Sequence, residues 1–408
     1  MSVPRKVSRM LAVLGLLSLP CALAEGNDMF SLSGFGTLGV AYHDERGVTY
    51  RRDVSQIRGA ESGRIDPRPD SMLGAQLNVR LSGRTEAVLQ AISREAIGTG
   101  WAPRVNWAYL KYTPDESSAL RLGRLGLDLD LQGDLADIGY AGLMVRPQVI
   151  LNPRFFEGVD AETTVPMAGG TLRLKGLAGW TRGRLLSGGE VYDTSGSTVY
   201  GGLAEYMRGG WSGRLSAGRV TMAKEAEGVD ALREALASAP EGHAALAGIL
   251  MENRRQDFAA LALAYEGGPL RTQASYTRVV SPGWTDQHMF YANAGYRLER
   301  LTPYLGYTRF WMDSSLVSTG IPDGLSEATD QFNAVTALAQ SAPKVNKHVL
   351  AAGLRYELDD HMALKVQADV IRYKDPDNLI DPAQDATPAD RRSWKSMMLY
   401  SMSLDFVF

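Results

Sequence analysis

Few residues of this sequence have the types and spacing that enzymatic chemistry requires. Asp286 lies two residues before His288, and His348 begins a predicted strand, but nothing around either histidine marks it as a catalytic base. No GxSxG, HExxH or phosphate-loop motif occurs in the sequence. The single cysteine, Cys21, and the five scattered histidines give no basis for a metal site. We therefore expect no enzymatic activity, no metal and no cofactor.

Charged residues point to a different chemistry, because many of them occupy the polar face of alternating segments. Residues of this kind are Arg80, Arg121, Arg173, Lys175, Arg214, Arg271, Arg297, Arg355, Lys365, Glu86 and Asp369. Four aspartates also fall within ten residues, and these are Asp128, Asp130, Asp134 and Asp137. Fixed charges along a wall are how water-filled pores discriminate between ions. The alternatives are wall charges that only pair across strands and a solvated surface loop for the four aspartates.

The segments that carry these charges have the pattern of β-strands. In the final segment, Met398, Tyr400 and Met402 share one face, whereas Ser401 and Ser403 share the other. Alternation over about ten residues is typical of a half-buried strand, and about ten residues is the length that a tilted strand needs to cross a bilayer. The sixteen strands that we predict are residues 30–43, 71–82, 85–93, 104–113, 119–124, 154–165, 170–181, 199–208, 211–221, 257–266, 269–281, 288–298, 302–311, 348–358, 361–373 and 395–408.

The predicted connections alternate between two lengths. Seven tight turns, such as 209–210 and 359–360, alternate with eight longer loops, such as 44–70, 125–153 and 222–256. This unbroken series of hairpins favours a closed membrane barrel over a soluble β-sandwich, which is the competing architecture. Burying the polar-face charges in a dry interior would cost several kcal/mol each. We therefore predict an all-β, antiparallel transmembrane barrel whose polar-face charges, named above, line a water-filled lumen.

The beginning of the chain and its overall charge indicate where the protein acts. A basic start is followed by an apolar run that ends at Pro20 and by the small-x-small cleavage signal Ala22-Leu23-Ala24. This is the layout of a secretory signal peptide, so we predict a signal peptide at 1–24 and a single domain at 25–408. The net charge of −3 over 408 residues gives no reason to expect a nucleic-acid partner.

Two of the long loops show helical spacing. Ala226, Val229 and Leu232 follow one another at three residues within loop 222–256, and residues 325–340 form a similar piece in a later loop. A helical hairpin over the mouth of a barrel would act as a lid or as an interaction surface. A loop that only packs on its own barrel is the alternative.

Three short stretches resemble the Gram-negative outer-membrane general porins, which are sixteen-stranded. The terminal residues 404–408 (LDFVF) are similar to the signal that the outer-membrane assembly machinery reads on such barrels. Residues 30–40 (FSLSGFGTLGV) are similar to a porin first strand, and residues 120–124 (LRLGR) to the strand end that precedes the third loop. The chain departs from the family in its unusually long loop 222–256 and in loop 125–153, which lacks the commonest acidic tip motif.

The resemblance implies a site, a setting and a function. It implies that loop 125–153 folds into the barrel, so that its four aspartates face Arg80, Arg121 and Arg124 across a constriction. It implies a homotrimer in the lipid of the outer membrane, Phe408 as the assembly signal, and passive diffusion of small hydrophilic solutes and ions. A substrate-specific outer-membrane channel, or a barrel that serves adhesion or surface structure through its long loops, remains open.

Overall fold

The protein is described here by a computed structural model. The described residues are 29–133, 136–146, 154–187, 190–227, 229–282, 286–313, 317–341, 346–373, 380–382 and 396–408. The predicted signal peptide, residues 1–24, lies outside the described residues.

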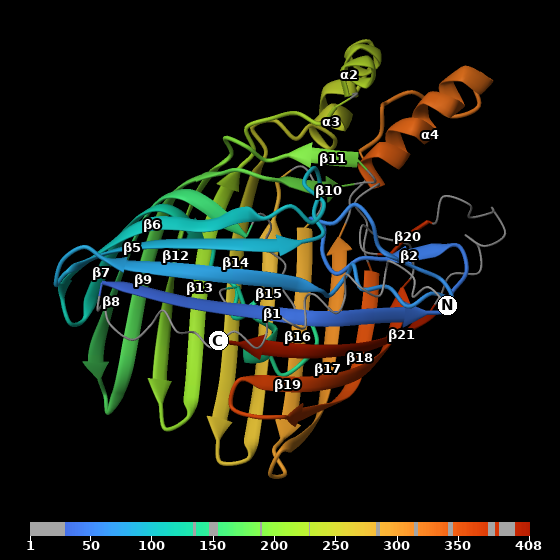
Figure 1. Cartoon of the computed structure of the whole chain (residues 1–408). Coiled ribbons are helices and arrows are strands. Elements are labelled where there is room, and N and C mark those ends of the chain that lie inside the picture. The colour runs from blue at the N-terminus through green and yellow to red at the C-terminus, as the bar shows by residue number, and fades with distance from the viewer. Residues whose placement is uncertain are drawn as a thin grey trace, which may run out of the picture.

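Sixteen antiparallel strands close into one barrel, shown in Figure 1. In chain order they are β1 (Phe30–His43), β4 (Met72–Arg80), β5 (Thr85–Arg94), β6 (Arg104–Asp115), β7 (Ser118–Gly126), β8 (Phe155–Met167), β9 (Gly170–Thr181), β12 (Thr198–Arg208), β13 (Trp211–Thr221), β14 (Arg255–Gly267), β15 (Leu270–Val280), β16 (Asp286–Tyr296), β17 (Leu301–Asp313), β18 (Asn346–Glu357), β19 (Met362–Tyr373) and β21 (Ser396–Val407). Strand β1 closes on β21, with Phe35 opposite Val407. Each predicted strand overlaps one of these, so the predicted sixteen-stranded barrel is confirmed.

Alternation along the strands separates an apolar outer face from a polar inner face. On β21, Tyr400 and Met402 are exposed on the outside, whereas Ser401 and Ser403 are buried on the inside. Closure pairs the two edge strands of the sheet, and a bilayer requires this because hydrocarbon cannot satisfy free backbone groups. The period-two pattern therefore determines both the strands and the face that each side chain occupies.

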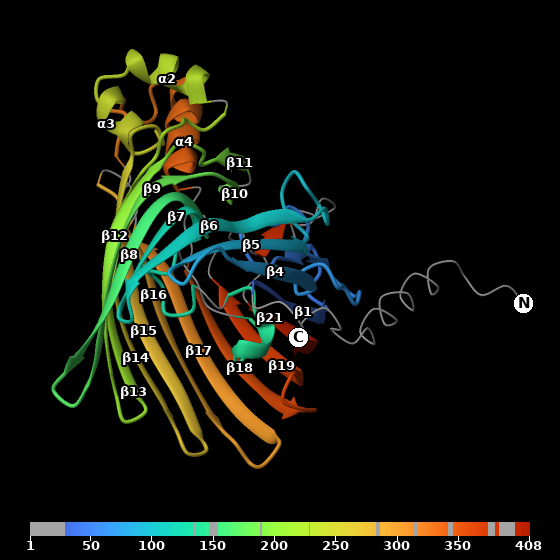
Figure 2. The same cartoon turned by 60° about the vertical axis from the view of Figure 1, so that its left-hand side comes forward.

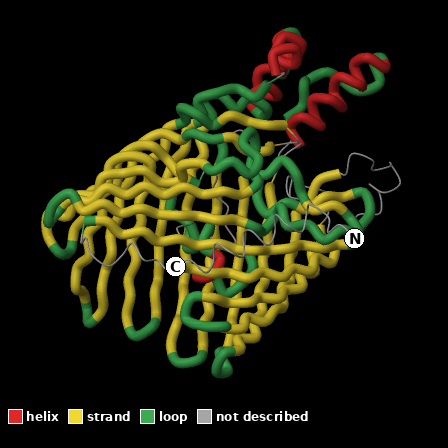
Figure 3. The backbone as a smooth tube through the Cα atoms, in the orientation of Figure 1, coloured by secondary structure: helices red, strands yellow, loops and turns green. Residues whose placement is uncertain are grey.

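Tight turns and long loops lie at opposite ends of the barrel (Figures 1 and 3). The loop end carries α2 (Val229–Ala237) and α3 (Gly242–Ala247) between β13 and β14, and α4 (Glu327–Ser341) between β17 and β18. The predicted helical pieces in these two loops are thus confirmed. Phe332 of α4 packs against an apolar cluster formed by α2 and α3, and Figure 2 shows the helices projecting beyond the barrel wall. Within the described ranges, no helix combines the length and apolar character needed to cross a membrane.

Two small sheets in the long loops were not predicted. β2 (Val48–Tyr50) pairs with β3 (Ala60–Glu61) and with β20 (Ile380–Pro382), and β10 (Arg184–Ser187) pairs with β11 (Glu190–Asp193). Strands of two to four residues are too short to establish a period-two pattern in a sequence. The first of these sheets places the first and last long loops side by side at the mouth of the barrel.

The wall is irregular where β6 runs between β5 and β7. The register of β5 and β6 shifts between Gln90 and Ala91. Pairing of β6 with β7 begins at Ala108, whereas residues 104, 105 and 107 have their partners on β5. The upper part of β6 therefore separates from β7 at the loop end of the barrel.

Candidate functional site

The third long loop, which joins β7 to β8 and is called loop 3 below, lies inside the barrel, as predicted. Two of its leucines, Leu127 and Leu129, pack against inward-facing side chains of the wall. The apolar cluster that they join consists of Leu125, Phe156, Leu177, Val199, Phe258 and Val279. These wall residues occupy the face that we expected to be polar. They are apolar because they pack against loop 3 rather than facing water.

Asp128, between these two leucines, forms a buried ion pair with the wall. Its carboxylate accepts a hydrogen bond from Lys175 Nζ at 2.6 Å and lies 3.5 Å from Arg173. Lys175 also lies 3.2 Å from Asp160 of β8. The side chains of Asp128 and Lys175 are each 1% exposed, so each charge depends on the other for compensation.

Basic side chains of the wall also bind the backbone of loop 3. The donors and the carbonyl oxygens that accept are Arg214 to Asp130 at 3.1 Å, Arg271 to Ala141 at 2.9 Å, Arg355 to Tyr140 and Gly142 at 2.6 and 2.7 Å, and Lys365 to Gly139 at 2.7 Å. A buried carbonyl without a partner is costly, so these bonds stabilise the position of the loop. All four donors were predicted to face the lumen, and in the structure each of them donates to the backbone of loop 3 inside the barrel. Their role in ion passage stays a prediction.

Gly139 brings loop 3 closest to the seam between β1 and β21. A Cβ atom at this position would collide with the side chains of Thr37 and Asp405, which are hydrogen-bonded to each other at 2.6 Å. Lys365 lies 3.1 Å from the same aspartate. Glycine is required here because the loop backbone approaches the wall too closely for any side chain.

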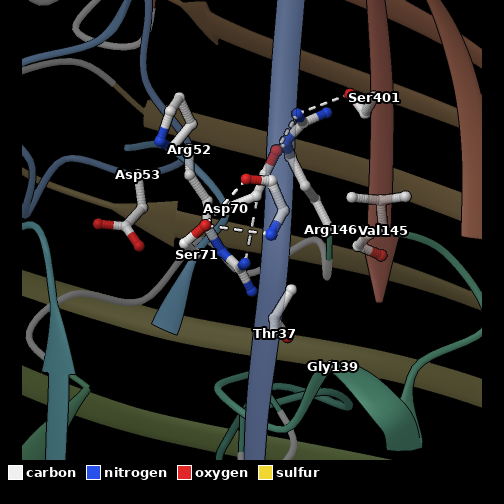
Figure 4. A network of polar contacts seen from close by, with 12 residues as sticks. Thr37, Arg52, Asp53, Asp70, Ser71, Gly139, Val145, Arg146 and Ser401 are labelled. Atoms are coloured by element: carbon white, nitrogen blue, oxygen red, sulfur yellow. Dashed lines mark hydrogen bonds and ion pairs between the residues drawn. The ribbon is translucent and has the colours of Figure 1, made fainter. Parts of the chain in front are cut away.

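Arg146 anchors loop 3 to the barrel wall and to the first long loop, as Figure 4 shows. Its guanidinium donates two hydrogen bonds to Asp70 of the first long loop, at 2.8 and 2.5 Å, and lies 3.2 Å from Asp369 of β19. It also donates to Ser401 Oγ of β21 at 2.7 Å. Arg52 lies 3.9 Å from Asp70. These two arginines and two aspartates, called the Arg146 network below, are buried and join two loops to the wall.

Comparison with known proteins gives the same architecture. No protein-family model and no curated protein matches the chain. Among solved structures, the anion-selective porin from Comamonas acidovorans has 13% identity and a TM-score of 0.54, covering 93% of this chain and 99% of that one. The outer membrane channel DcaP of Acinetobacter baumannii has 11% identity and a TM-score of 0.56, covering 93% and 97%. The trimer form of OmpT, an outer membrane protein of Vibrio cholerae, has 7% identity and a TM-score of 0.52, covering 93% and 100%.

The chain has the porin fold. The likeness extends over nearly the whole of each chain. At identities this low it establishes the fold alone, so the role of individual residues has to come from their contacts in this barrel.

Three arginines were predicted to face the aspartates of loop 3, but in this barrel they make other contacts. Arg80 is the last residue of β4 and is exposed at the turn end, far along the wall from the loop end. Arg121 faces the lumen, but its guanidinium binds Asp160 at 2.8 and 2.6 Å. Arg124 binds Glu157 at 2.6 Å. Residues three apart on a strand point to opposite faces, so β7 cannot present both of its arginines to the lumen.

The aspartates of loop 3 have other partners than those predicted. Asp137 lies 2.9 Å from Arg154 and 3.9 Å from Arg94. Asp130 is buried, like Asp128, rather than projecting into open solvent. Asp134 lies outside the described residues. Loop 3 is therefore held to the wall by its acids, and the predicted transverse field would have to arise from charges other than Arg80 and Arg124.

The remaining lumen-facing predictions fall into two groups. Arg173 lies on the inner face, 3.0 Å from Glu162 and 3.4 Å from Glu205, in line with its predicted position. Glu86, the second residue of β5, lies opposite Arg80 in the strand register. Arg297 was predicted within a strand, but β16 ends one residue before it, and its side chain is exposed at the turn end. The wall prediction thus describes the middle of the strands better than their turn ends.

The histidines do not form a catalytic arrangement with the aspartate near them. Asp286 binds Arg278 at 2.6 Å instead of His288. His288 contacts Tyr276 at 2.8 Å and lies 3.0 Å from Asp313. In the part of the chain that the structure describes, no group of three or more His, Cys, Asp or Glu side chains could hold a metal ion.

Sequence reasoning missed the residues of the first long loop that reach the lumen. Asp53 binds Arg94 at 2.7 Å and Arg154 at 3.0 Å, and Asp70 binds Arg146. These residues lie in a segment without hydrophobic periodicity, and such a segment predicts only a connection between strands. The available signal was its unusual length, since loops of more than about 12–15 residues are uncommon unless they are functional or disordered.

Proposed function

We propose that this protein is a water-filled channel for the passive diffusion of small hydrophilic solutes and ions across the Gram-negative outer membrane. One observation carries the proposal: a closed sixteen-stranded barrel has charged side chains along its inner face and a loop inside it. A barrel of this strand number is wide enough to leave an aqueous channel.

Solvent exposure of the inner charges supports a hydrated lumen. The side chains of Arg121, Arg173 and Glu162 retain 21%, 22% and 28% exposure although they face inwards and are ion-paired. Charges that water reaches in this way carry a smaller desolvation cost than charges in a dry core. Proteins of similar fold that are named as a porin and as an outer membrane channel support the same function.

Conductance of the purified protein in planar lipid bilayers tests the proposal. We expect stepwise current increments in potassium chloride, and permeation by neutral sugars in liposome swelling. Permeation that depends only on solute size supports a general channel, whereas saturation by one solute class supports the substrate-specific alternative. Protein that inserts without conductance would contradict the channel and favour the adhesion or surface-structure alternative.

The loop lengths support an orientation with the long loops outside the cell and the tight turns in the periplasm. An epitope inserted at Ser238, between α2 and α3, should be labelled on intact cells. The same epitope inserted between Asp359 and Asp360, in a tight turn, should be labelled only after the outer membrane is opened. The reverse pattern would contradict the orientation.

We also propose a homotrimer with Phe408 as the signal for the assembly machinery. The trimeric form of a similarly folded outer membrane protein supports the first part. In the structure the Phe408 amide donates to the Gly34 carbonyl at 2.9 Å and the residue is 55% exposed, so it completes the seam yet stays accessible. Cross-linked membranes that contain only monomer would contradict the trimer, and normal membrane levels of Phe408→Ala would contradict the signal.

A further inference from the structure

A pocket of about 310 Å³ lies at the loop end of the barrel, where β6 separates from β7. It is lined by the upper ends of barrel strands and by residues of the first four long loops. Six of its lining residues are arginines, namely Arg94, Arg104, Arg124, Arg154, Arg182 and Arg184. Asp137 is the acidic residue among the described residues that line it. This pocket is called the arginine pocket below.

The charges of the arginine pocket do not balance. Asp53 and Asp137 are shared between Arg94 and Arg154, at distances from 2.7 to 3.9 Å. Glu157 is shared by Arg124 and Arg182, at 2.6 and 3.6 Å. Counting the lining residues and their ion-pair partners, six arginines face three carboxylates, which leaves a surplus of three positive charges.

The surplus is concentrated on Arg104 and Arg184. Within the described residues, neither guanidinium has a hydrogen bond or an ion pair, and Arg104 Nε is buried without a partner. Arg104 is the first residue of β6 and lies on the same side of the strand as Asn106, which faces into the barrel. Arg184 belongs to the hairpin of β10 and β11, and its guanidinium lies against Gly98. A buried guanidinium nitrogen without an acceptor is costly, so this geometry favours a ligand that supplies acceptor oxygens.

We propose that the arginine pocket binds a small solute with at least two negative charges, such as a phosphate compound or a dicarboxylate. Guanidinium groups match such oxyanions because each can donate two parallel hydrogen bonds. The volume lies at the lower end of the range for small-molecule sites, which limits the ligand to a compact molecule. The site lies at the rim, away from the contacts of Asp128 inside the barrel, and its binding does not depend on whether the lumen conducts.

Equilibrium binding to the purified full chain in detergent tests this proposal without any measurement of current. Isothermal titration calorimetry with pyrophosphate, succinate and acetate, at about 0.1 M salt, compares two divalent or polyvalent anions with a monovalent one. We expect pyrophosphate or succinate to bind at least roughly tenfold more tightly than acetate, and the tighter of the two identifies phosphate or carboxylate chemistry.

Variants assign this binding to the surplus arginines. Arg104→Gln/Arg184→Gln should weaken binding of the preferred anion by roughly tenfold or more. Arg184→Gln alone, an exposed position on a loop hairpin, should weaken it by a smaller factor and cannot act by unfolding the barrel. The matched control Arg84→Gln/Arg300→Gln removes two exposed charges at the turn end and should leave binding unchanged. Equal binding of acetate, unchanged binding in the first double variant, or equal loss in the control would overturn the proposal.

Discussion

The Arg146 network and the arginine pocket are both built from arginines at the loop end of the barrel, but their charges are balanced differently. In the network, Arg52 and Arg146 face Asp70 and Asp369, and all four are buried. In the pocket there are six arginines, and four of them share three carboxylates. Matched charges hold two loops against the wall, whereas unmatched charges create a positive potential that a solute can use.

Solvent exposure explains why a surplus of positive charge is tolerated in the arginine pocket but would not be tolerated in the Arg146 network. The side chain of Arg146 is 4% exposed and that of Asp70 is fully buried, so an unpaired charge there would have neither water nor a partner. Arg182 is 63% exposed and part of the pocket opens to solvent, which hydrates charges that lack a carboxylate. A balanced buried cluster is therefore structural, whereas an unbalanced cluster at the solvent boundary is a candidate binding site.

The largest expected effect comes from breaking the balanced network. Arg146→Met leaves Asp70 and Asp369 buried without their main partner, which costs about 3–5 kcal/mol for a buried pair. We expect a lower thermal unfolding temperature by circular dichroism, and larger or noisier single-channel currents because loop 3 loses an anchor. Arg300→Met, at an exposed turn, is the control and should change neither.

A quadruple variant separates charge balance from packing in the same network. Arg52→Met/Arg146→Met/Asp70→Asn/Asp369→Asn removes all four charges together and should recover most of the lost stability, because neutral replacement of a whole buried cluster is often tolerated. A quadruple variant as unstable as Arg146→Met would show that the hydrogen bonds, and not the charge balance, hold the loop.

A smaller effect should follow from removing the carboxylates of loop 3. Asp128→Asn/Asp137→Asn leaves Lys175, Arg173 and Arg154 less compensated, so we expect reversal potentials in a salt gradient to shift towards anion preference. Lys175→Gln should shift them in the opposite direction. Both shifts should shrink at about 1 M salt, where the Debye length is about 3 Å. Unchanged reversal potentials in both variants would place ion selection elsewhere in the lumen.

A few-fold effect should follow from reducing the surplus of the arginine pocket. Thr99→Asp adds one carboxylate to the lining at an exposed position. We expect anion binding by calorimetry to weaken a few-fold, because an exposed charge pair contributes about 0.2–1 kcal/mol. Ser238→Asp, in the exposed turn between α2 and α3, adds the same charge away from the pocket. Equal weakening in both variants would indicate a general effect of net charge.

The smallest effect is expected from mild acid. Burial raises the pKa of the Asp53 and Asp137 carboxyls, but Arg94 and Arg154 outweigh it and hold both pKa values below their usual range. A carboxyl with a lowered pKa contributes stability above its unfolded pKa and loses it as the pH falls through its folded pKa. Asp53→Asn/Asp137→Asn should therefore lower the thermal unfolding temperature by the same amount at pH 7 and at pH 5. A markedly smaller loss at pH 5 would mean that these acids are protonated more easily than their contacts imply.

The orientation of the two arginines of β7 could have been predicted from their spacing in the sequence. Arg121 and Arg124 are three residues apart, so the strand period alone excludes a common face. The sequence therefore contained the evidence against placing both at a constriction, and the structure agrees by pairing them with Asp160 and Glu157. The turn-end position of Arg297 was harder to predict, because strand ends are uncertain by two to four residues.

Strand number, closure and the two ends of the barrel follow from local properties of the sequence. Alternation has a period of two residues and turn length is a count of a few residues, so both can be read without knowing what a segment touches. The helical pieces in two loops follow for the same reason. Apolar residues on the inner face, such as Phe156 and Phe258, could not be assigned in this way, because their environment is loop 3 and not lipid.

The partners of the charged residues were decided by the tertiary structure. Asp128 meets Lys175 across 47 residues of sequence, and Arg146 meets Asp369 across 223. Such pairs depend on which strands the closed barrel places beside loop 3 and on how far that loop extends into the lumen. Coulomb attraction depends on the distance between two charges in space and not on their separation in sequence, and screening weakens it at longer range. Composition and spacing therefore indicated that the lumen is charged, and the fold alone decided which charges are matched and which are left for a solute.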